Sequence, residues 1–171
     1  MLKKLCVAAA LALPLSAMAE GLSYNYLEGS YVIPENDDAF RIGGSFLLNP
    51  QFFLKADGTV FEGGNLLTGQ LGYRHALNNT LDLNITGGLL YADPDGGDSE
   101  TGYTFGGGLR ALVAPQLELN GGIAYVDIYD NSDVAFSVGA VYNFNANWAI
   151  SGGGTFVDDA DEFNVGVRYN F

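Results

Sequence analysis

A two-residue alternation of apolar with small or polar side chains runs through this chain and constrains its fold more than any other feature. It appears in ten segments separated by turn-forming residues: 22–33, 39–48, 51–61, 65–76, 80–91, 101–113, 117–126, 134–144, 148–157 and 162–171. Alternation of this period, rich in aromatic and β-branched residues, predicts β-strands. Each segment is close to the nine to eleven residues with which a tilted strand crosses a bilayer.

The last segment shows the two faces. Its apolar face carries Phe163, Val165, Val167, Tyr169 and Phe171, while asparagine, glycine and arginine occupy the other. A soluble sandwich would bury the apolar face in a core, whereas a membrane barrel turns it to lipid and lines its lumen with the polar face. Because lipid offers no partners to free backbone groups, such a sheet must close on itself.

The few basic residues favour the barrel. Of seven Lys and Arg, Lys3 and Lys4 lie near the start, and the five others all fall on polar faces: Arg41, Lys55, Arg74, Arg110 and Arg168. A lipid-facing Arg or Lys would cost about 2–4 kcal/mol near the bilayer midplane. With twenty acidic residues against these five, the chain after residue 19 has a formal charge of −15, and the absence of a basic patch excludes default nucleic-acid binding.

The connections between segments differ at the two ends of the expected barrel. Those after odd-numbered segments, with Glu162 included, hold fifteen of the twenty acidic residues, and those after even-numbered segments hold none. This asymmetry predicts extracellular acidic loops and short periplasmic turns. Aromatic residues also gather toward both ends, as membrane-interface girdles do. We place at the acidic end Tyr31, Phe40, Tyr91, Tyr103, Tyr125, Phe156 and Phe163, and at the other end Phe52, Tyr73, Phe144, Trp148, Tyr169 and Phe171.

The first nineteen residues predict a cleaved secretory signal peptide. Lys3 and Lys4 precede an apolar stretch, and the sequence from Ala17 to Ala19 forms a small-residue cleavage site. The remaining residues, 20–171, are enough for one domain. Since Cys6 is the only cysteine, disulfides and thiol chemistry are excluded after cleavage.

The terminal stretch from Phe163 to Phe171, alternating apolar residues that end in Phe, resembles the C-terminal signature of outer-membrane barrels. Together with the opening stretch from Leu22 to Tyr31, it makes the chain similar to small Gram-negative OmpA-like and porin-like barrel domains. The resemblance implies an outer-membrane location, contact with lipid and lipopolysaccharide, and recognition by the barrel-assembly machinery. We expect an all-β, antiparallel, up-and-down transmembrane barrel of ten strands, with eight as the alternative, and a monomer.

Nine charged residues are expected to point into the lumen: Glu28, Arg41, Lys55, Asp57, Arg74, Asp82, Arg110, Glu118 and Arg168. Three-residue turns at 77–79 and 113–115 would set Arg74 directly opposite Asp82 and Arg110 directly opposite Glu118, where opposite charges attract. Two interpretations remain open: a salt-bridged plug in a narrow barrel, or a charged constriction that selects small solutes.

The densest acidic loop offers a candidate divalent-cation site at Asp93, Asp95, Asp98 and Glu100, because oxygen ligands suit Ca²⁺ or Mg²⁺. The alternative is a solvated loop of mutually repelling charges. No cofactor is expected. We expect no enzymatic activity either, because the lone His75 lies at the neutral end with outward parity, where it cannot serve as the base of an extracellular site. The sequence therefore predicts a structural barrel or a low-conductance porin-like pore, with a surface-interaction protein acting through its acidic loops as the alternative.

Overall fold

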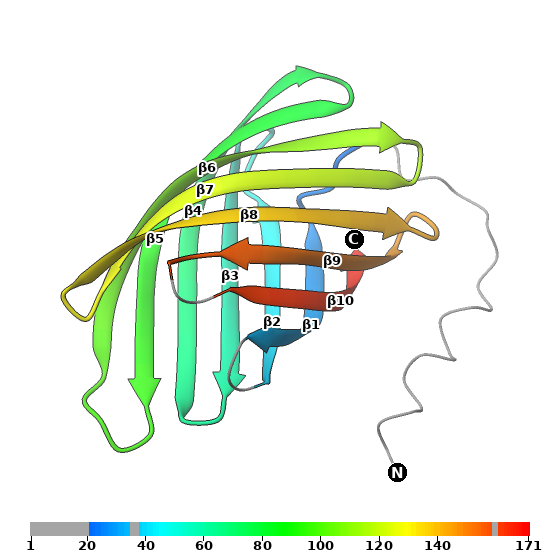
Figure 1. Ribbon diagram of the computed structural model, residues 1–171. Helices are drawn as coiled ribbons and strands as arrows, with labels where there is room; N and C mark the ends of the chain where they lie inside the picture. The colour runs from blue at the N-terminus through cyan, green and yellow to red at the C-terminus, as the bar shows by residue number, and fades with distance from the viewer. Residues whose placement is uncertain (1–20, 35–37, 159–160) are drawn as a thin grey trace, which may run out of the picture.

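The computed structural model describes residues 21–34, 38–158 and 161–171. The predicted signal peptide and Glu20 lie outside these residues. The described chain forms ten strands, shown in Figure 1. They are β1 (Tyr26–Pro34), β2 (Ala39–Leu47), β3 (Phe52–Phe61), β4 (Gly64–Asn78), β5 (Leu81–Pro94), β6 (Glu100–Ala114), β7 (Leu117–Ile128), β8 (Asn131–Asn143), β9 (Trp148–Phe156) and β10 (Glu162–Asn170). The ten predicted strands are confirmed, and the eight-strand alternative is wrong.

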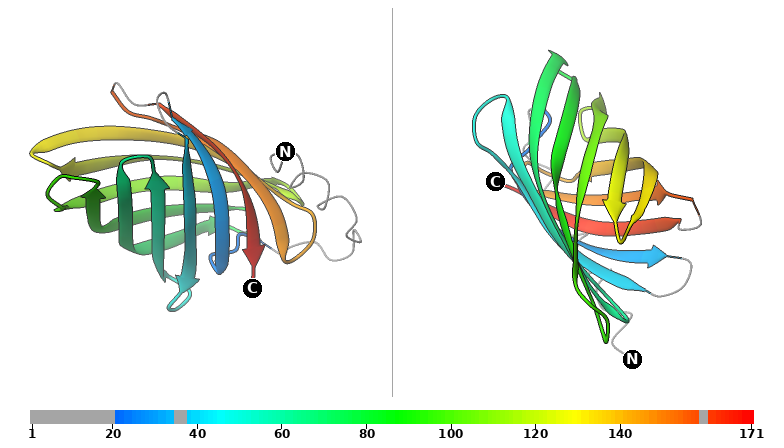
Figure 2. Two further views of the ribbon diagram at one scale, coloured as in Figure 1. Left: turned by 90° about the horizontal axis from the view of Figure 1, so that it is seen from below. Right: turned by 90° about the vertical axis from the view of Figure 1, so that its left-hand side faces the viewer.

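The sheet is a closed antiparallel barrel in which every strand pairs with its sequence neighbours and β1 pairs with β10. The closing pair runs in register from Tyr26 opposite Asn170 to Pro34 opposite Glu162. Figures 1 and 2 show the strands of the two walls crossing steeply, as expected when strands tilt to close a barrel. We call the end with Tyr26 and Asn170 the terminal end, and the opposite end the acidic end.

Side chains partition in the opposite sense to a soluble protein. Outward positions carry large apolar residues that are more than half exposed, such as Leu27, Leu89 and Phe105, while buried positions include Ser30, Asp82 and Glu118. This inversion is the pattern of a barrel that faces lipid with its outside. Among the residues that the structure describes, there is no helix of the length and hydropathy needed to cross a bilayer.

Aromatic rings pair at both ends of the wall, across neighbouring strands except for Tyr142 and Phe144, which lie two residues apart at the end of β8. Three ring pairs lie at the terminal end, Phe52 with Tyr73, Tyr142 with Phe144 and Trp148 with Tyr169. At the acidic end Tyr103 lies beside Tyr125, and Phe156 beside Phe163. Most of these rings are at least one-third exposed, so they form the two outward girdles that the sequence predicts.

The first strand begins later than predicted. Residues 22–25 were expected to belong to it, but β1 starts at Tyr26, and residues 21–25 form an irregular arm. Tyr24 in this arm is buried, with 2% of its surface exposed. Alternation continues through the arm in the sequence, so the pattern alone could not distinguish it from a strand.

Two hairpin turns at the acidic end are shorter than predicted. The predicted connection at 127–133 is a two-residue turn, because Ile128 pairs with Asn131. Tyr129 and Asp130 have φ angles of 55° and 58°, the left-handed pair that a type I′ turn requires. Phe61 likewise pairs with Gly64, so β3 and β4 are joined by two residues. Much of the acidic sequence therefore lies on strand ends.

Candidate functional site

The lumen holds the charged residues that the sequence singled out. Four ion pairs lie along its wall, at three levels of the barrel. Two pairs lie near the terminal end, one lies further along β1 and β10, and one lies near the acidic end. Together they contain seven of the nine predicted residues and add Glu162, which the sequence analysis put at the start of the last strand but counted with the acidic loops.

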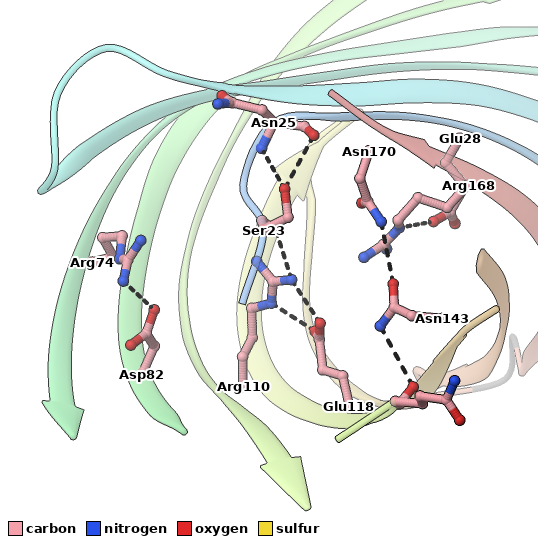
Figure 3. A network of polar contacts seen from close by, with 11 residues as sticks. Ser23, Asn25, Glu28, Arg74, Asp82, Arg110, Glu118, Asn143, Arg168 and Asn170 are labelled. Atoms are coloured by element: carbon pink, nitrogen blue, oxygen red, sulfur yellow. Dashed lines mark hydrogen bonds and ion pairs between the residues drawn. The ribbon is translucent and has the colours of Figure 1, made fainter. Parts of the chain in front are cut away.

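At the terminal end, Arg110 binds Glu118 through two parallel hydrogen bonds, Nε to Oε1 at 2.7 Å and Nη2 to Oε2 at 2.8 Å. Both side chains are nearly buried, and Figure 3 shows them at the foot of the arm beside Ser23. Bidentate guanidinium–carboxylate pairs are the strongest of their kind. This pair therefore fixes β6 to β7 inside the lumen.

Arg74 and Asp82 approach each other less favourably. Arg74 Nη2 lies 2.9 Å from Asp82 Oδ2, but the groups are not aligned as a hydrogen bond, and within the described residues this buried oxygen and Arg74 Nε have no hydrogen-bond partner. The attraction is therefore mainly between the two charges. Arg74 is the less tightly held of the two arginines at this end.

The predicted register of both pairs is wrong by two residues. Arg74 lies opposite Asn84, and Arg110 lies opposite Asn120, because each hairpin closes with a two-residue turn and a β-bulge, at Leu77 and at Val113, in place of a three-residue turn. A bulge adds one unpaired residue to one strand. The arginines still reach their partners because diagonal neighbours on one sheet face lie within reach of long side chains.

Tyr24 occupies the space between these pairs, and the sequence analysis did not find it. The guanidinium carbons of Arg74 and Arg110 lie 4.7 and 4.3 Å from the centre of its ring, and the Phe53 ring lies 4.8 Å away. Cation–π contacts of this kind contribute about 0.5–2 kcal/mol each. A buried aromatic ring thus narrows the lumen at the terminal end.

The arm that carries Tyr24 is held by polar contacts on both sides. Arg110 Nη2 donates to the Ser23 carbonyl at 2.9 Å, as Figure 3 shows. Asn25 Oδ1 accepts from the Leu47 amide at 2.8 Å, and the Asn25 carbonyl accepts from the Phe171 amide at 3.1 Å. The arm is therefore tied to β2, to β6 and to the end of the chain.

The next level is formed by Glu28 and Arg168, which lie directly opposite each other on β1 and β10. Arg168 Nε donates to Glu28 Oε2 at 2.6 Å, and the guanidinium carbon lies 4.0 Å from the centre of the Tyr26 ring. The pair joins the first and last strands of the barrel. It therefore stabilises the closure of the sheet from the inside.

Near the acidic end Arg41 bridges three strands. Its Nη2 donates to both carboxylate oxygens of Glu162 at 3.1 Å, and its Nε donates to Thr59 at 2.9 Å. Glu162 is the first residue of β10 and has the inward parity of Asn164 and Arg168. The sequence alone gives this parity, so it could have placed Glu162 in the lumen.

Lys55 and Asp57, both on β3, complete the predicted lumen residues. Among the residues that the structure describes, neither has an oppositely charged group within 4.0 Å. Lys55 borders two cavities of about 290 and 240 Å³, and Asp57 borders the second. The cavities share the lining residues Tyr26, Lys55, Asn120, Ser137 and Arg168. The lumen thus holds adjoining polar space in spite of its ion pairs.

The four acidic residues of the candidate cation site do not converge. Within the described chain, no three His, Cys, Asp or Glu residues are grouped so that they could hold a metal ion.

Tyrosines accompany the carboxylates at the acidic end. Asp127 accepts hydrogen bonds from Tyr103 and Tyr125, at 3.3 and 3.1 Å. Loss of solvent around the Tyr129 phenol raises its pKa, and the nearby carboxylates of Glu100 and Asp93 raise it further.

The remaining predicted positions lie on the outer wall. The five apolar residues of the C-terminal signature, Phe163, Val165, Val167, Tyr169 and Phe171, are all exposed on the outside of β10 or directly after it. His75 is exposed near the terminal end of β4. It belongs to neither of the two lumen cavities.

No protein-family model and no curated protein sequence matches the chain. Several solved structures do match it. The structure described as KdgM porin matches with a TM-score of 0.57 and 15% identity, over 85% of this chain and 99% of that one. KdgM porin in complex with disordered oligogalacturonate matches with a TM-score of 0.56, 16% identity and the same coverage. NanC porin matches with a TM-score of 0.56 and 8% identity, over 86% and 100% of the two chains. The chain therefore has the fold of outer-membrane porin barrels.

Proposed function

We propose that this chain is a passive pore of the bacterial outer membrane that admits small polar solutes at low conductance. The observation that carries the proposal is the pair of adjoining polar cavities inside a closed barrel. A barrel that served only as a structural element could fill this space with side chains, as narrow barrels do. In the present lumen, ion pairs lie against the wall, and space remains beside them.

The terminal end sets the conductance. In the proposed orientation this end faces the periplasm, the side on which outer-membrane barrels carry their short turns. The start of β1 and the end of β10 lie at the same end. Tyr24, Arg74 and Arg110 narrow the passage there, and the arm that carries Tyr24 lies partly across it. Solutes much larger than a monosaccharide would be excluded as long as the arm stays in place.

The structural neighbours support a pore, but they do not indicate which solute passes through it. One neighbour is described with oligogalacturonate, a polyanion. In the present chain, the ten lumen charges are balanced, with Glu162 the fifth acid beside five bases. Arg41, the basic residue described near the acidic end, is paired with Glu162, so the carboxylates dominate the charge of this end. A mouth of one charge sign repels ions of that sign. We therefore propose that polyanions are poor solutes for this pore.

Several further proposals follow from the same account. His75 lies outside the lumen cavities, which supports a pore without enzymatic activity. We propose contact with lipid and lipopolysaccharide along the apolar wall, recognition of the strand that ends in Phe171 by the assembly machinery, and a monomer. The two-residue turns between β3 and β4 and between β7 and β8 give less support to a surface-interaction role, because they leave little chain free there to fold around a partner.

Swelling of proteoliposomes tests the proposal. The mature chain is refolded into liposomes, and swelling is followed in isotonic solutions of glycerol, arabinose and a trisaccharide. We expect rapid swelling in glycerol, slower swelling in arabinose and none in the trisaccharide. Liposomes without protein serve as the control. Equal swelling with and without protein in every solute would show that the barrel does not conduct solutes.

A further inference from the structure

Two lumen charges differ from the other eight. Arg41, Arg74, Arg110 and Arg168 each pair with a carboxylate at 3.1 Å or less, whereas Lys55 and Asp57 pair with no described residue within 4.0 Å. Lys55 is exposed and Asp57 is half-exposed, so both charges are available to water or to a solute in the lumen. Both side chains border cavity space, so a solute can reach them.

The backbone fixes the separation of the two charges. Lys55 and Asp57 lie on the inward face of β3 two residues apart, and this spacing is about 7 Å along a strand. Gly43 lies opposite Asp57 on β2, and a Cβ there would come within 2.8 Å of the Asp57 Cβ. Glycine thus leaves Asp57 room. A positive and a negative group are held side by side along one strand.

Opposite charges at this spacing match a ligand that carries both signs. A carboxylate of the ligand would accept from the Lys55 ammonium, and an ammonium of the ligand would donate to the Asp57 carboxylate, with charge-assisted hydrogen bonds on both sides. An anion alone would meet Asp57 and a cation alone would meet Lys55, each with repulsion. Uncharged polyols would leave both protein charges without a counter-charge.

The acidic end favours the same class of ligand. Its carboxylates repel anions, but a zwitterion has no net charge and is not repelled. The other charged residues that line this cavity, Glu28, Arg41 and Arg168, are held in ion pairs. Uncharged polar side chains, among them Asn120, Ser137 and Asn164, can accommodate the rest of a small polar molecule. A cavity of about 240 Å³ restricts the ligand to a few non-hydrogen atoms beyond its two charged groups.

We infer that Lys55 and Asp57 form a binding site for small zwitterions, namely free α-amino acids, in the lumen. This inference rests on the proposed pore function, because the solute reaches the site through the lumen. It assigns the pore a preferred solute class and two residues that select it.

Ligand-observed NMR tests the site without requiring transport. The refolded mature chain in detergent micelles is titrated with L-serine, and saturation transfer reports binding. We expect saturable binding that glycerol, lactate and ethanolamine compete with poorly. Lys55→Gln and Asp57→Asn should each weaken it about tenfold, since each removes one charge-assisted bond. Lys55→Arg should retain most of the binding because it keeps the charge.

A matched control is Asp98→Asn, which makes the same chemical change in the exposed turn between β5 and β6 and should leave binding unchanged. Absence of saturable serine binding to the wild type, or unchanged binding in Asp57→Asn, would overturn the inference. Equal competition by lactate would overturn it as well and would leave Lys55 as an anion site. Failure of the pore itself would appear separately, as an absence of swelling in the liposome assay.

Discussion

Arg110 and Glu118 lie on neighbouring strands two residues out of register, yet their side chains form a bidentate ion pair with both hydrogen bonds shorter than 2.9 Å. Arg110 also donates to the Ser23 carbonyl, so one guanidinium joins the wall of the barrel to the arm that crosses its lumen. The stability of the barrel and the width of its passage therefore depend on the same residue.

Loss of this pair should destabilise the barrel strongly. Glu118→Gln removes the carboxylate charge from a site where both side chains are nearly buried and leaves the Arg110 charge uncompensated. We expect the free energy of unfolding to fall by about 3 kcal/mol, measured by urea titration in micelles. Glu162→Gln is the control, because its pair is about one-quarter exposed, and we expect a loss of about 1 kcal/mol or less. Equal losses in both variants would contradict the proposed difference.

Substitution by alanine should affect the stability of the barrel differently at two glycines of β4. A Cβ on Gly72 would overlap the buried ring of Phe53, whereas a Cβ on Gly69 would meet nothing within 4 Å. We expect Gly72→Ala to lower the free energy of unfolding by about 1–3 kcal/mol. Gly69→Ala should leave it unchanged or raise it by up to about 1 kcal/mol. Urea titration of both variants under one condition measures the contrast, and a tolerated Gly72→Ala would show that Phe53 moves freely in the lumen.

The β7–β8 turn carries local backbone strain. Tyr129 and Asp130 both adopt positive φ, a conformation that asparagine and glycine tolerate better than a bulky side chain. Replacing the two residues with Asn-Gly should raise the free energy of unfolding by about 1 kcal/mol. The opposite change, Gly63→Ala at φ +104°, should lower stability by a similar amount. An Asn-Gly variant less stable than the wild type would mean that Tyr129 makes contacts that outweigh the strain.

Trp148 should report the position of the wall in the bilayer. It is the only tryptophan, it is 41% exposed on the outer face, and it packs edge-on against Tyr169 at the terminal end. Aromatic residues of this kind lie at the level of lipid headgroups. We expect its fluorescence to be quenched more by lipids brominated near the headgroup than by lipids brominated near the chain end. Preferential quenching by aqueous iodide would place Trp148 outside the membrane.

Strand number, strand direction and the inward parity of nine charged residues could be predicted from the sequence, because a period of two is a local property of the chain. Register could not. The bulges at Leu77 and Val113 depend on how each hairpin closes, and the alternation around them is undisturbed. The predicted partners still met, since an arginine side chain spans the two-residue error.

Tyr24 was missed for a different reason. It shares the inward parity of Tyr26 and Glu28, so the pattern placed it in a strand along the wall. Its ring instead packs in the arm against two arginines and Phe53. That packing depends on residues from three other strands. Glu162 is the contrasting case, because the parity of β10 in the sequence was sufficient to place it in the lumen.

Single-channel recording in planar bilayers tests the central claim, that an open polar lumen is narrowed by Tyr24. Wild-type and Tyr24→Ala barrels are compared in one salt solution, with Tyr103→Ala as a control on the outer wall near the acidic end. The account predicts small stable steps for the wild type and for Tyr103→Ala, and steps at least about twice as large for Tyr24→Ala, since removing the ring widens the passage between Arg74 and Arg110. Identical steps in all three proteins, or none in any of them, would contradict it.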